Sequence, residues 1–194
     1  MHNIYNTDAF VMNNIPSNEA DYLIILFSKE FGLIKAKAKG VRYLKSKLRF
    51  SLQPYCFSKV SLVKGKGGWM IVNASPEENM KSGLSYKNFM VVARVSALLE
   101  RLLQGEEKNE GLYEILTSSK KFLEGEIKDE NILDIEYMLA LRILDNLGYI
   151  SSRAELREFL DDHFRWDNDL LDKMNQKSKF AINEINRAIK ESQL

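Results

Sequence analysis

The stretch Leu33-Ile34-Lys35-Ala36-Lys37-Ala38-Lys39-Gly40 alternates basic with small apolar residues. Successive side chains of a β-strand point to opposite faces, so Lys35, Lys37 and Lys39 are expected on one face and the two alanines on the other. A face of small side chains suits the interior of a tight barrel. The stretch therefore predicts a barrel strand from Leu33 to Lys39 that Gly40 ends.

Four further stretches on either side of this strand are rich in β-branched and aromatic residues, which is typical of strands. They are residues 8–12, 21–28, about 55–63 and 69–74. Turn residues at 13–18, at 29–32 and in the glycine-rich segment 64–68 separate them, and Pro76 ends the series. The longer segment 41–53 is expected to hold a helical turn near residues 46–51. Five short strands in about 70 residues predict a small closed or partly closed barrel.

The rest of the chain has apolar residues at helical spacing. The expected helices are residues 85–103, 110–123 and 132–147, a short one ending at Leu160, one from 167 to 174, and a last one from Ser178. Asn131, Ser152, Asp167 and Ser178 are the expected N-caps. The sequence thus predicts an α+β protein, with a barrel domain at residues 1–78 and an all-α domain at 79–194.

The net charge of +1 conceals two halves of opposite sign. Residues 1–75 carry 11 Lys/Arg and 4 Asp/Glu, a net charge of +7, whereas residues 76–194 carry 17 and 23, a net charge of −6. No acid lies between Phe31 and Pro76. This asymmetry indicates an anionic partner for the first half.

Other classes of protein are disfavoured. No apolar run approaches the length that spans a membrane, and the N-terminus lacks a secretory pattern, so we expect a cytoplasmic protein. Cys56 is the only cysteine, which excludes an intrachain disulfide and any zinc site built on two thiolates of this chain. No arrangement of His163 or His2 with a nucleophile indicates an enzyme, and His163 in the segment 161–164 is read as a solvated helix end rather than a metal ligand.

The basic segments are therefore the candidate binding site. The lysines of the strand would stand at roughly 7 Å intervals, close to the phosphate spacing of a nucleic-acid strand. The segment 42–49 adds further cations, Tyr43 could stack on a base, and the glycines of 64–68 let a backbone approach phosphates. The candidate DNA-binding residues are Lys35, Lys37, Lys39, Arg42, Tyr43, Lys45, Lys47, Arg49, Lys64 and Lys66.

Simpler explanations stand beside these. Lysines can protect an exposed edge strand from association, and segment 42–49 could be a mobile loop. Tyr55, Phe50 and Trp69 could stack on bases or fill the core, and Phe57 is expected in the core.

The residues between 8 and 75 resemble the family of the DNA repair protein RecO. The resemblance lies in an acid before a strand that ends in a tight turn, then Ala38-Lys39-Gly40, then the basic segment 45–49, then Leu52-Gln53-Pro54. The helix ending in Leu147-Gly148-Tyr149 is similar to the family more loosely. The resemblance implies an N-terminal OB-fold packed on a helical domain. It also implies binding of single- and double-stranded DNA and annealing of complementary strands.

The resemblance further implies partnership with RecR, contact of the helical domain with the acidic tail of single-strand binding protein, and an indirect role in loading RecA. Many family members carry a four-cysteine zinc module after the Leu-Gly-Tyr helix. This chain has no cysteine there, so we expect no metal and no cofactor. An RNA-binding OB-fold protein and a module that docks an acidic protein remain alternatives.

Overall fold

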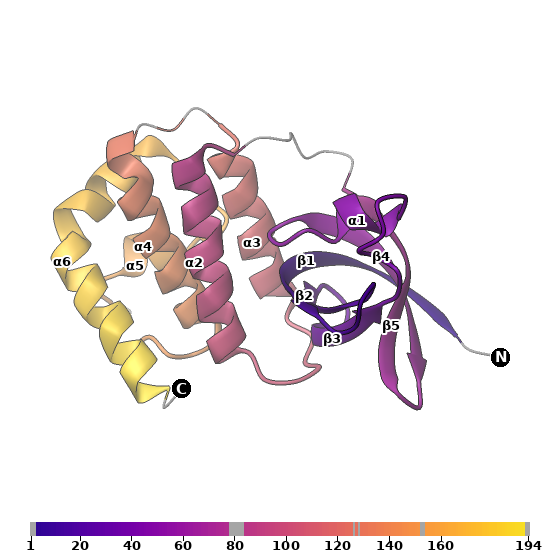
Figure 1. Ribbon diagram of the computed structural model, residues 1–194. Coiled ribbons are helices and arrows are strands. Elements are labelled where there is room, and N and C mark those ends of the chain that lie inside the picture. Colours follow the sequence, from indigo (N-terminus) through magenta and orange to yellow (C-terminus); the bar gives the residue numbers. More distant parts are fainter. Residues whose placement is uncertain (1–2, 78–83, 126, 128, 152–153, 193–194) are drawn as a thin grey trace. The chain divides into compact units, whose positions relative to one another are not determined.

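The computed structural model describes residues 3–77, 84–125, 127, 129–151 and 154–192. The chain divides into two compact units (Figure 1). The barrel unit contains residues 1–81 and 103–110, and the helical unit contains residues 82–102 and 111–194.

Five strands form the barrel unit: β1 (Ile4–Pro16), β2 (Tyr22–Ser28), β3 (Gly32–Ala38), β4 (Phe57–Gly65) and β5 (Gly68–Pro76). They close into a barrel in the order β1-β2-β3-β5-β4. Every pairing is antiparallel except that of β3 with β5, which is parallel. The expected α+β class is confirmed, with an OB-fold-like N-terminal barrel.

Strand β1 is longer than the sequence predicts. A short strand at residues 8–12 followed by a turn at 13–18 was the expectation, but β1 continues to Pro16. The prediction is wrong because the pairing with β2 shifts between Val11 and Asn13, and this bulge lets the strand bend and continue. The side chain of Asn13 accepts a hydrogen bond from the Asn14 N–H at 2.8 Å, which accommodates these turn-forming residues within the strand.

Small and branched side chains fill the barrel. Ala36 and Ala38 are fully buried there beside Ile24, Leu26 and Ile71. Three aromatic rings pack edge to face or tilted against this core: Tyr5, Phe31 and Trp69 lie 5.4–5.6 Å apart between ring centroids. Their mutual contacts bury apolar area at the end of β3 where the β2–β3 turn lies.

Residues 103–110, here called the strap, return to the barrel unit. Gly32 has φ +69°, and a Cβ at this position would lie 2.0 Å from the carbonyl oxygen of Glu107. Two ion pairs hold the strap to the same turn: Lys108 to Glu30 at 3.3 Å and Lys29 to Glu110 at 3.2 Å. The strap therefore lies directly on the β2–β3 turn.

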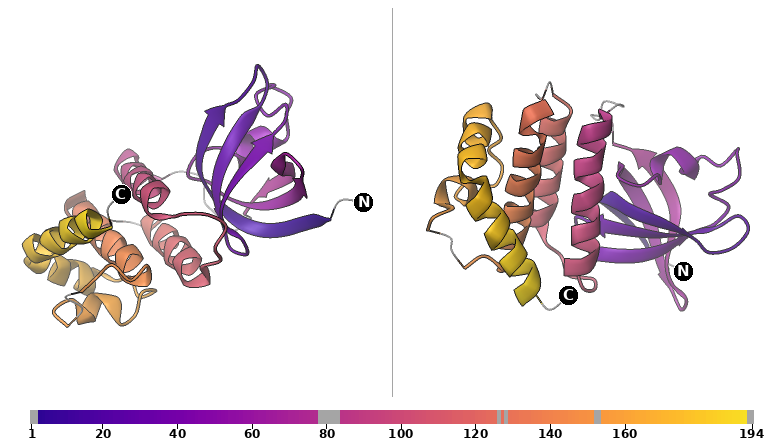
Figure 2. Two further views of the ribbon diagram at one scale, coloured as in Figure 1. Left: turned by 90° about the horizontal axis from the view of Figure 1, so that it is seen from below. Right: turned by 60° about the vertical axis from the view of Figure 1, so that its left-hand side comes forward.

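The helical unit is built around α4 (Ile132–Asn146), which packs against α2 (Tyr86–Leu102) and α6 (Asn168–Glu191) (Figure 2). The other elements are α3 (Glu110–Leu123), the 3-10 turn η1 (Asp129–Asn131) and α5 (Arg157–Leu160), while α1 (Leu48–Ser51) belongs to the barrel unit. Ten residues of α4 are buried, which identifies it as the centre of this core.

The last helix corrects one prediction. Asp167 caps it, as expected, by accepting a hydrogen bond from the Leu170 N–H at 2.9 Å. The helix does not end at Met174 and restart at Ser178, however. Its buried stripe continues from Met174 to Ala181 and Ala188, so the face that packs on α4 passes through Ser178 without a break.

Two further helix caps were expected, at Asn131 and Ser152. The side chain of Asn131 makes no capping hydrogen bond, because η1 leads directly into α4. Ser152 lies outside the described residues. Gly148 has φ +80° and follows α4 as predicted.

Arg142 of α4 holds the segment after this helix. Its side chain is fully buried, donates to the carbonyl oxygens of Phe159 at 2.9 Å and Arg165 at 2.7 Å, and lies 4.3 Å from the ring centroid of Trp166. Burial lowers the pKa of Arg142 to about 10, so it stays charged at neutral pH. A buried cation on two carbonyls and an aromatic ring thus organises the segment that follows α4.

The contact between Gly32 and the strap gives a stability prediction. Gly32→Ala should lower the free energy of unfolding by about 2 kcal/mol or more, because a Cβ strains a positive φ and clashes with backbone. Urea unfolding followed by circular dichroism measures this. Gly67→Ala is the matched control, since nothing lies within 4 Å of its Cβ position. Equal stability of the two variants would contradict the strap's place on the turn.

Candidate nucleic-acid interface

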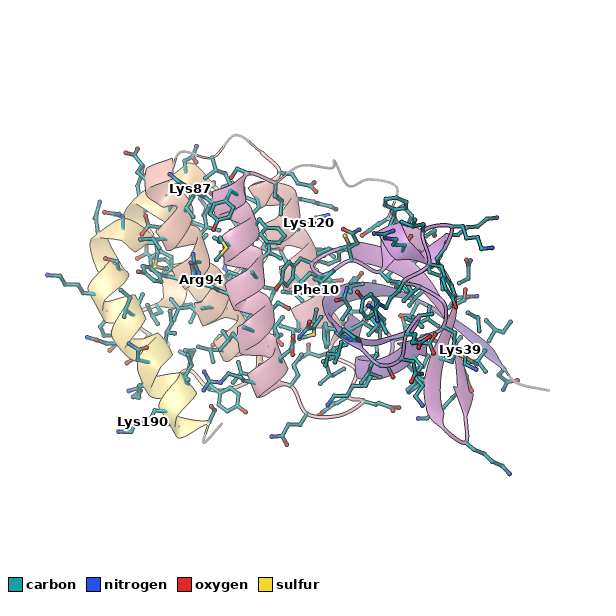
Figure 3. All side chains as sticks on the ribbon, viewed as in Figure 1. Phe10, Lys39, Lys87, Arg94, Lys120 and Lys190 are labelled. Carbon is teal, nitrogen blue, oxygen red and sulfur yellow. The ribbon has the colours of Figure 1, made fainter. Side chains whose placement is uncertain are left out.

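The three candidate lysines of β3 lie on the outside of the barrel. Lys35 and Lys37 are exposed, whereas Ala36 and Ala38 are fully buried. Lys39, labelled in Figure 3, follows the last residue of β3 and is also exposed. The predicted alternation is confirmed, and neighbouring lysines on the strand are spaced at roughly 7 Å.

Strand β3 is not an edge strand. It pairs with β2 on one side, and on the other it pairs with β5 at Ala36↔Trp69, Lys37↔Met70 and Ala38↔Ile71. A lysine at a position that is paired on both sides does not protect an edge. The simpler explanation for the lysine row therefore fails at Lys37.

Apolar side chains surround Lys37. Its directly paired neighbours are Leu23 on β2 and Met70 on β5, and Met70 pairs in turn with Val63 on β4. Directly paired residues share a face of the sheet, and all three neighbours are half-buried. The face therefore offers apolar surface for sugars and bases with a cation in its middle.

The connector between β3 and β4 (residues 39–56) is anchored at its start by Asp21. The carboxylate of Asp21 accepts a hydrogen bond from the Gly40 N–H at 2.8 Å and one from the Asn18 side chain at 3.2 Å. The backbone bond from Gly40 is the main cause that lowers the pKa of Asp21, and the charges of Lys39 and Lys37 act in the same direction.

Arg42 is both exposed and partly engaged by the protein itself. Its backbone N–H donates to the carbonyl of Ala20 at 3.0 Å, and its guanidinium donates to the carbonyl of Asn18 at 3.0 Å. The guanidinium carbon lies 5.6 Å from the ring centroid of Tyr22. Arg42 thus ties the connector to the β1–β2 turn.

The rest of the connector combines a buried underside with an exposed basic surface. Val41 and Leu52 are buried and Leu48 packs on the barrel core, while Ser58 donates to the carbonyl of Ser51 at 2.6 Å. The candidate residues Arg42, Tyr43, Lys45, Lys47 and Arg49 are all exposed. These anchors speak against a freely mobile loop.

Three large apolar side chains of the connector point to solvent. Tyr43 is 60% exposed, Leu44 86% and Phe50 75%. Exposed apolar side chains gathered in one segment are typical of an interaction surface. Tyr43 and Phe50 are suited to stack on bases, as the sequence suggested.

The other two candidates lie on the β4–β5 hairpin, where Gly65 pairs with Gly68. Lys66 is exposed in the turn. The ammonium of Lys64 lies 4.8 Å from the ring centroid of Trp69 and 2.7 Å from a carboxylate oxygen of Glu106 in the strap. Lys64 is therefore already paired with an anion.

The aromatic residues divide between core and surface. Phe57 is 4% exposed, as expected, and Trp69 is 6% exposed, so Trp69 belongs to the core rather than to a stacking surface. Tyr55 is half-buried and has φ +70°.

Four cations of the helical unit are labelled in Figure 3: Lys87 and Arg94 on α2, Lys120 on α3 and Lys190 on α6. His163 is not a solvated helix end, because its ring nitrogen lies 2.9 Å from the carboxylate of Asp145 and both side chains are largely buried. Among the described residues, no group of three or more potential ligands could hold a metal, and no helix could cross a membrane.

Sequence reasoning missed two acids that shape this site, Asp21 and Glu106. Asp21 is not among the candidate residues, yet it fixes the start of the connector. Glu106 is not among the candidate residues, yet it accepts hydrogen bonds from Lys64 and from the Trp69 indole N–H. Both contacts join residues that are distant in sequence, and no local pattern indicates them.

The lowered pKa of Asp21 predicts a pH-dependent effect. Its anchoring stabilises the fold above the ordinary pKa, about 3.8, and is lost as the pH falls through the lower folded-state value. Asp21→Ala should therefore lower the urea midpoint of unfolding at pH 7, and the gap to wild type should narrow below about pH 4. Glu19→Gln, in the same turn, is the charge-matched control. A gap that does not depend on pH would contradict the role of the carboxylate.

The comparisons with known proteins agree with this geometry. Residues 1–75 match the family model described as Recombination protein O N terminal. The chain is similar to the DNA repair protein RecO of Thermodesulfovibrio yellowstonii, with 30% identity over 165 residues that cover 79% of this chain and 64% of that protein.

Two further relatives carry the same description. The DNA repair protein RecO of Desulfitobacterium hafniense is 34% identical over 157 residues (80% of this chain, 56% of that protein). That of Dehalococcoides mccartyi is 28% identical over 163 residues (82% and 61%). The matches thus span between 56% and 64% of the length of these relatives. With residues 1–75 matched to the family model, and with relatives of 30% and 34% identity that match 79% and 80% of the chain, the chain belongs to the RecO family.

Proposed function

We propose that this chain binds single-stranded DNA on the outer face of β3 and along the connector, and that it works in DNA repair as a strand-annealing protein and recombination mediator. The observation that carries the proposal is Lys37, an exposed cation at a position of β3 that is paired on both sides and flanked by apolar neighbours. Family membership supports DNA as the ligand, because the relatives are described as DNA repair proteins.

The proposed mechanism needs no covalent chemistry, and we propose that the chain is not an enzyme. Lys35, Lys37 and Lys39 would neutralise successive phosphates and release counterions, so the affinity should fall steeply with salt. Cations on the connector would screen a second stretch of backbone, while exposed Tyr43 and Phe50 stack on bases. Reduced repulsion between two strands lets complementary bases meet, with little readout of sequence.

The partners are part of the same proposal. Membership of the RecO family supports cooperation with RecR in loading RecA onto single-stranded DNA, and contact of the helical unit with the acidic tail of single-strand binding protein. The family likewise supports binding of double-stranded DNA and a location at the nucleoid.

A binding measurement tests the lysine row. The triple variant Lys35→Ala, Lys37→Ala and Lys39→Ala should bind a fluorescent single-stranded oligonucleotide more weakly, and the slope of log affinity against log salt should become shallower by about 2, since each phosphate contact contributes about 0.7. Fluorescence anisotropy at several salt concentrations measures both.

Single variants supply the matched control for this test. Lys37→Ala and Lys59→Ala remove the same charge from the barrel, but Lys59 lies directly opposite Asp8 on β1, outside the basic face. Equal losses of affinity would contradict a site on β3. Tighter binding of RNA than of DNA by the wild type would favour the RNA-binding alternative.

An annealing assay tests the proposed activity itself. The protein should accelerate the pairing of two complementary labelled oligonucleotides at low salt, followed by fluorescence quenching. The acceleration should disappear when Lys35, Lys37 and Lys39 are replaced by Glu, because the row then repels phosphates. A folded wild-type protein that binds DNA but does not accelerate pairing would exclude the annealing role.

A further inference from the structure

The carboxylate of Glu106 in the strap occupies a pair of donors on the barrel. Lys64 donates to one of its oxygens at 2.7 Å, and the indole N–H of Trp69 donates to the other at 2.9 Å. The ammonium of Lys64 also lies over the Trp69 ring, at 4.8 Å from its centroid. Two donors on neighbouring strands thus converge on one anion.

This pair of donors can accept an anion from outside as well. A carboxylate and a phosphate both present two partly charged oxygens, and charge-assisted hydrogen bonds hold either group. Trp69 is largely buried, so its N–H has a fixed direction toward that anion. Trp69 pairs with Ala36 of β3 and with Lys64 of β4, so both donors lie on the inner side of the sheet at its hairpin end, on the face opposite the lysine row.

The ion pair between Glu106 and Lys64 forms within the protein, but it is weak enough for another anion to replace Glu106. The side chains of Lys64 and Glu106 are 51% and 43% exposed, and ion pairs of this exposure are screened by water and salt. The hydrogen bond from Lys64 is the main cause that lowers the pKa of Glu106, so this carboxylate is ionised at neutral pH. At neutral pH the carboxylate of Glu106 is therefore always present as a competing anion for Lys64 and Trp69.

The rest of the strap is held independently of Glu106. Lys108 pairs with Glu30, Glu110 pairs with Lys29, and the backbone of Glu107 lies against Gly32. Only the Glu106 side chain has to turn away for the donors to become free.

We propose that Lys64 and Trp69 form a phosphate site for a nucleic-acid strand, and that Glu106 competes with the phosphate for it from within the chain. The proposal rests on the proposed function and adds a second, regulated phosphate contact at the hairpin end of the barrel. Glu106 reduces the affinity of the protein for weakly bound nucleic-acid strands. The lysine row of β3 stays accessible. A strand that reaches the hairpin displaces the carboxylate and gains one more phosphate contact.

Glu106→Gln tests this, because it removes the charge and keeps the shape of the side chain. Binding of an oligothymidylate by fluorescence anisotropy should become several-fold tighter. The slope of log affinity against log salt should become steeper by about 0.7, the contribution of one further phosphate contact on a single strand.

The neighbouring Glu107→Gln is the matched control, because it removes the same charge from the strap without freeing Lys64. It should change the affinity less than Glu106→Gln and should leave the slope unchanged. Equal effects of the two variants would show a general change in net charge and overturn the inference.

A double-mutant cycle supplies the second measurement. Lys64→Ala should cost little affinity in the wild type, where Glu106 already occupies Lys64, and more in the Glu106→Gln background. If Glu106→Gln does not fold, Lys64→Ala alone still tests the idea: a loss as large as that of Lys37→Ala would overturn it. If neither wild type nor variants bind the oligonucleotide, the proposed function is wrong; if wild type binds and Glu106→Gln binds no tighter, only this inference is wrong.

Discussion

Three parallel residue pairs between β3 and β5 close the barrel, and the candidate interface depends on them. The small side chains of Ala36 and Ala38 leave room in the interior for Trp69 and Ile71 from the partner strand. Without this pairing, β3 would be an edge, and its lysines would be explained as protection against association. With it, Lys37 rises from the middle of a sheet between Leu23 and Met70, and a partner is the better explanation for its charge.

The connector shows how a basic, apolar surface can be kept in place. Ordering a flexible loop on binding costs conformational entropy, which reduces affinity. Asp21 and the carbonyls of Asn18 and Ala20 fix one end of the connector, and Val41 and Leu52 bury its underside. Tyr43 and Phe50 are consequently presented to solvent by an anchored backbone, so less entropy is lost when they contact bases.

The sequence predicts local features of this protein well and contacts between distant segments poorly. Alternation placed Lys35 and Lys37 outside and Ala36 and Ala38 inside, because the period of a strand is a property of its own backbone. The same reasoning ended β1 too early at its asparagines and divided α6 at Ser178, since pairing with β2 and packing on α4 override local preference. Trp69 could not be assigned from its neighbours in sequence, because its indole partner is Glu106.

The strap reveals a conflict between stability and binding in a basic domain. Cations gathered on one small barrel repel each other, and this repulsion opposes the compact state. Glu106 and Glu110 relieve it by pairing with Lys64 and Lys29, while Lys108 of the strap pairs with Glu30. An internal anion that stabilises the free protein, however, must compete with an external anion wherever the two share a donor. That competition falls on Lys64 of the hairpin, whereas β3 keeps its lysines available; the protein therefore neutralises charge at the hairpin rather than on the lysine row.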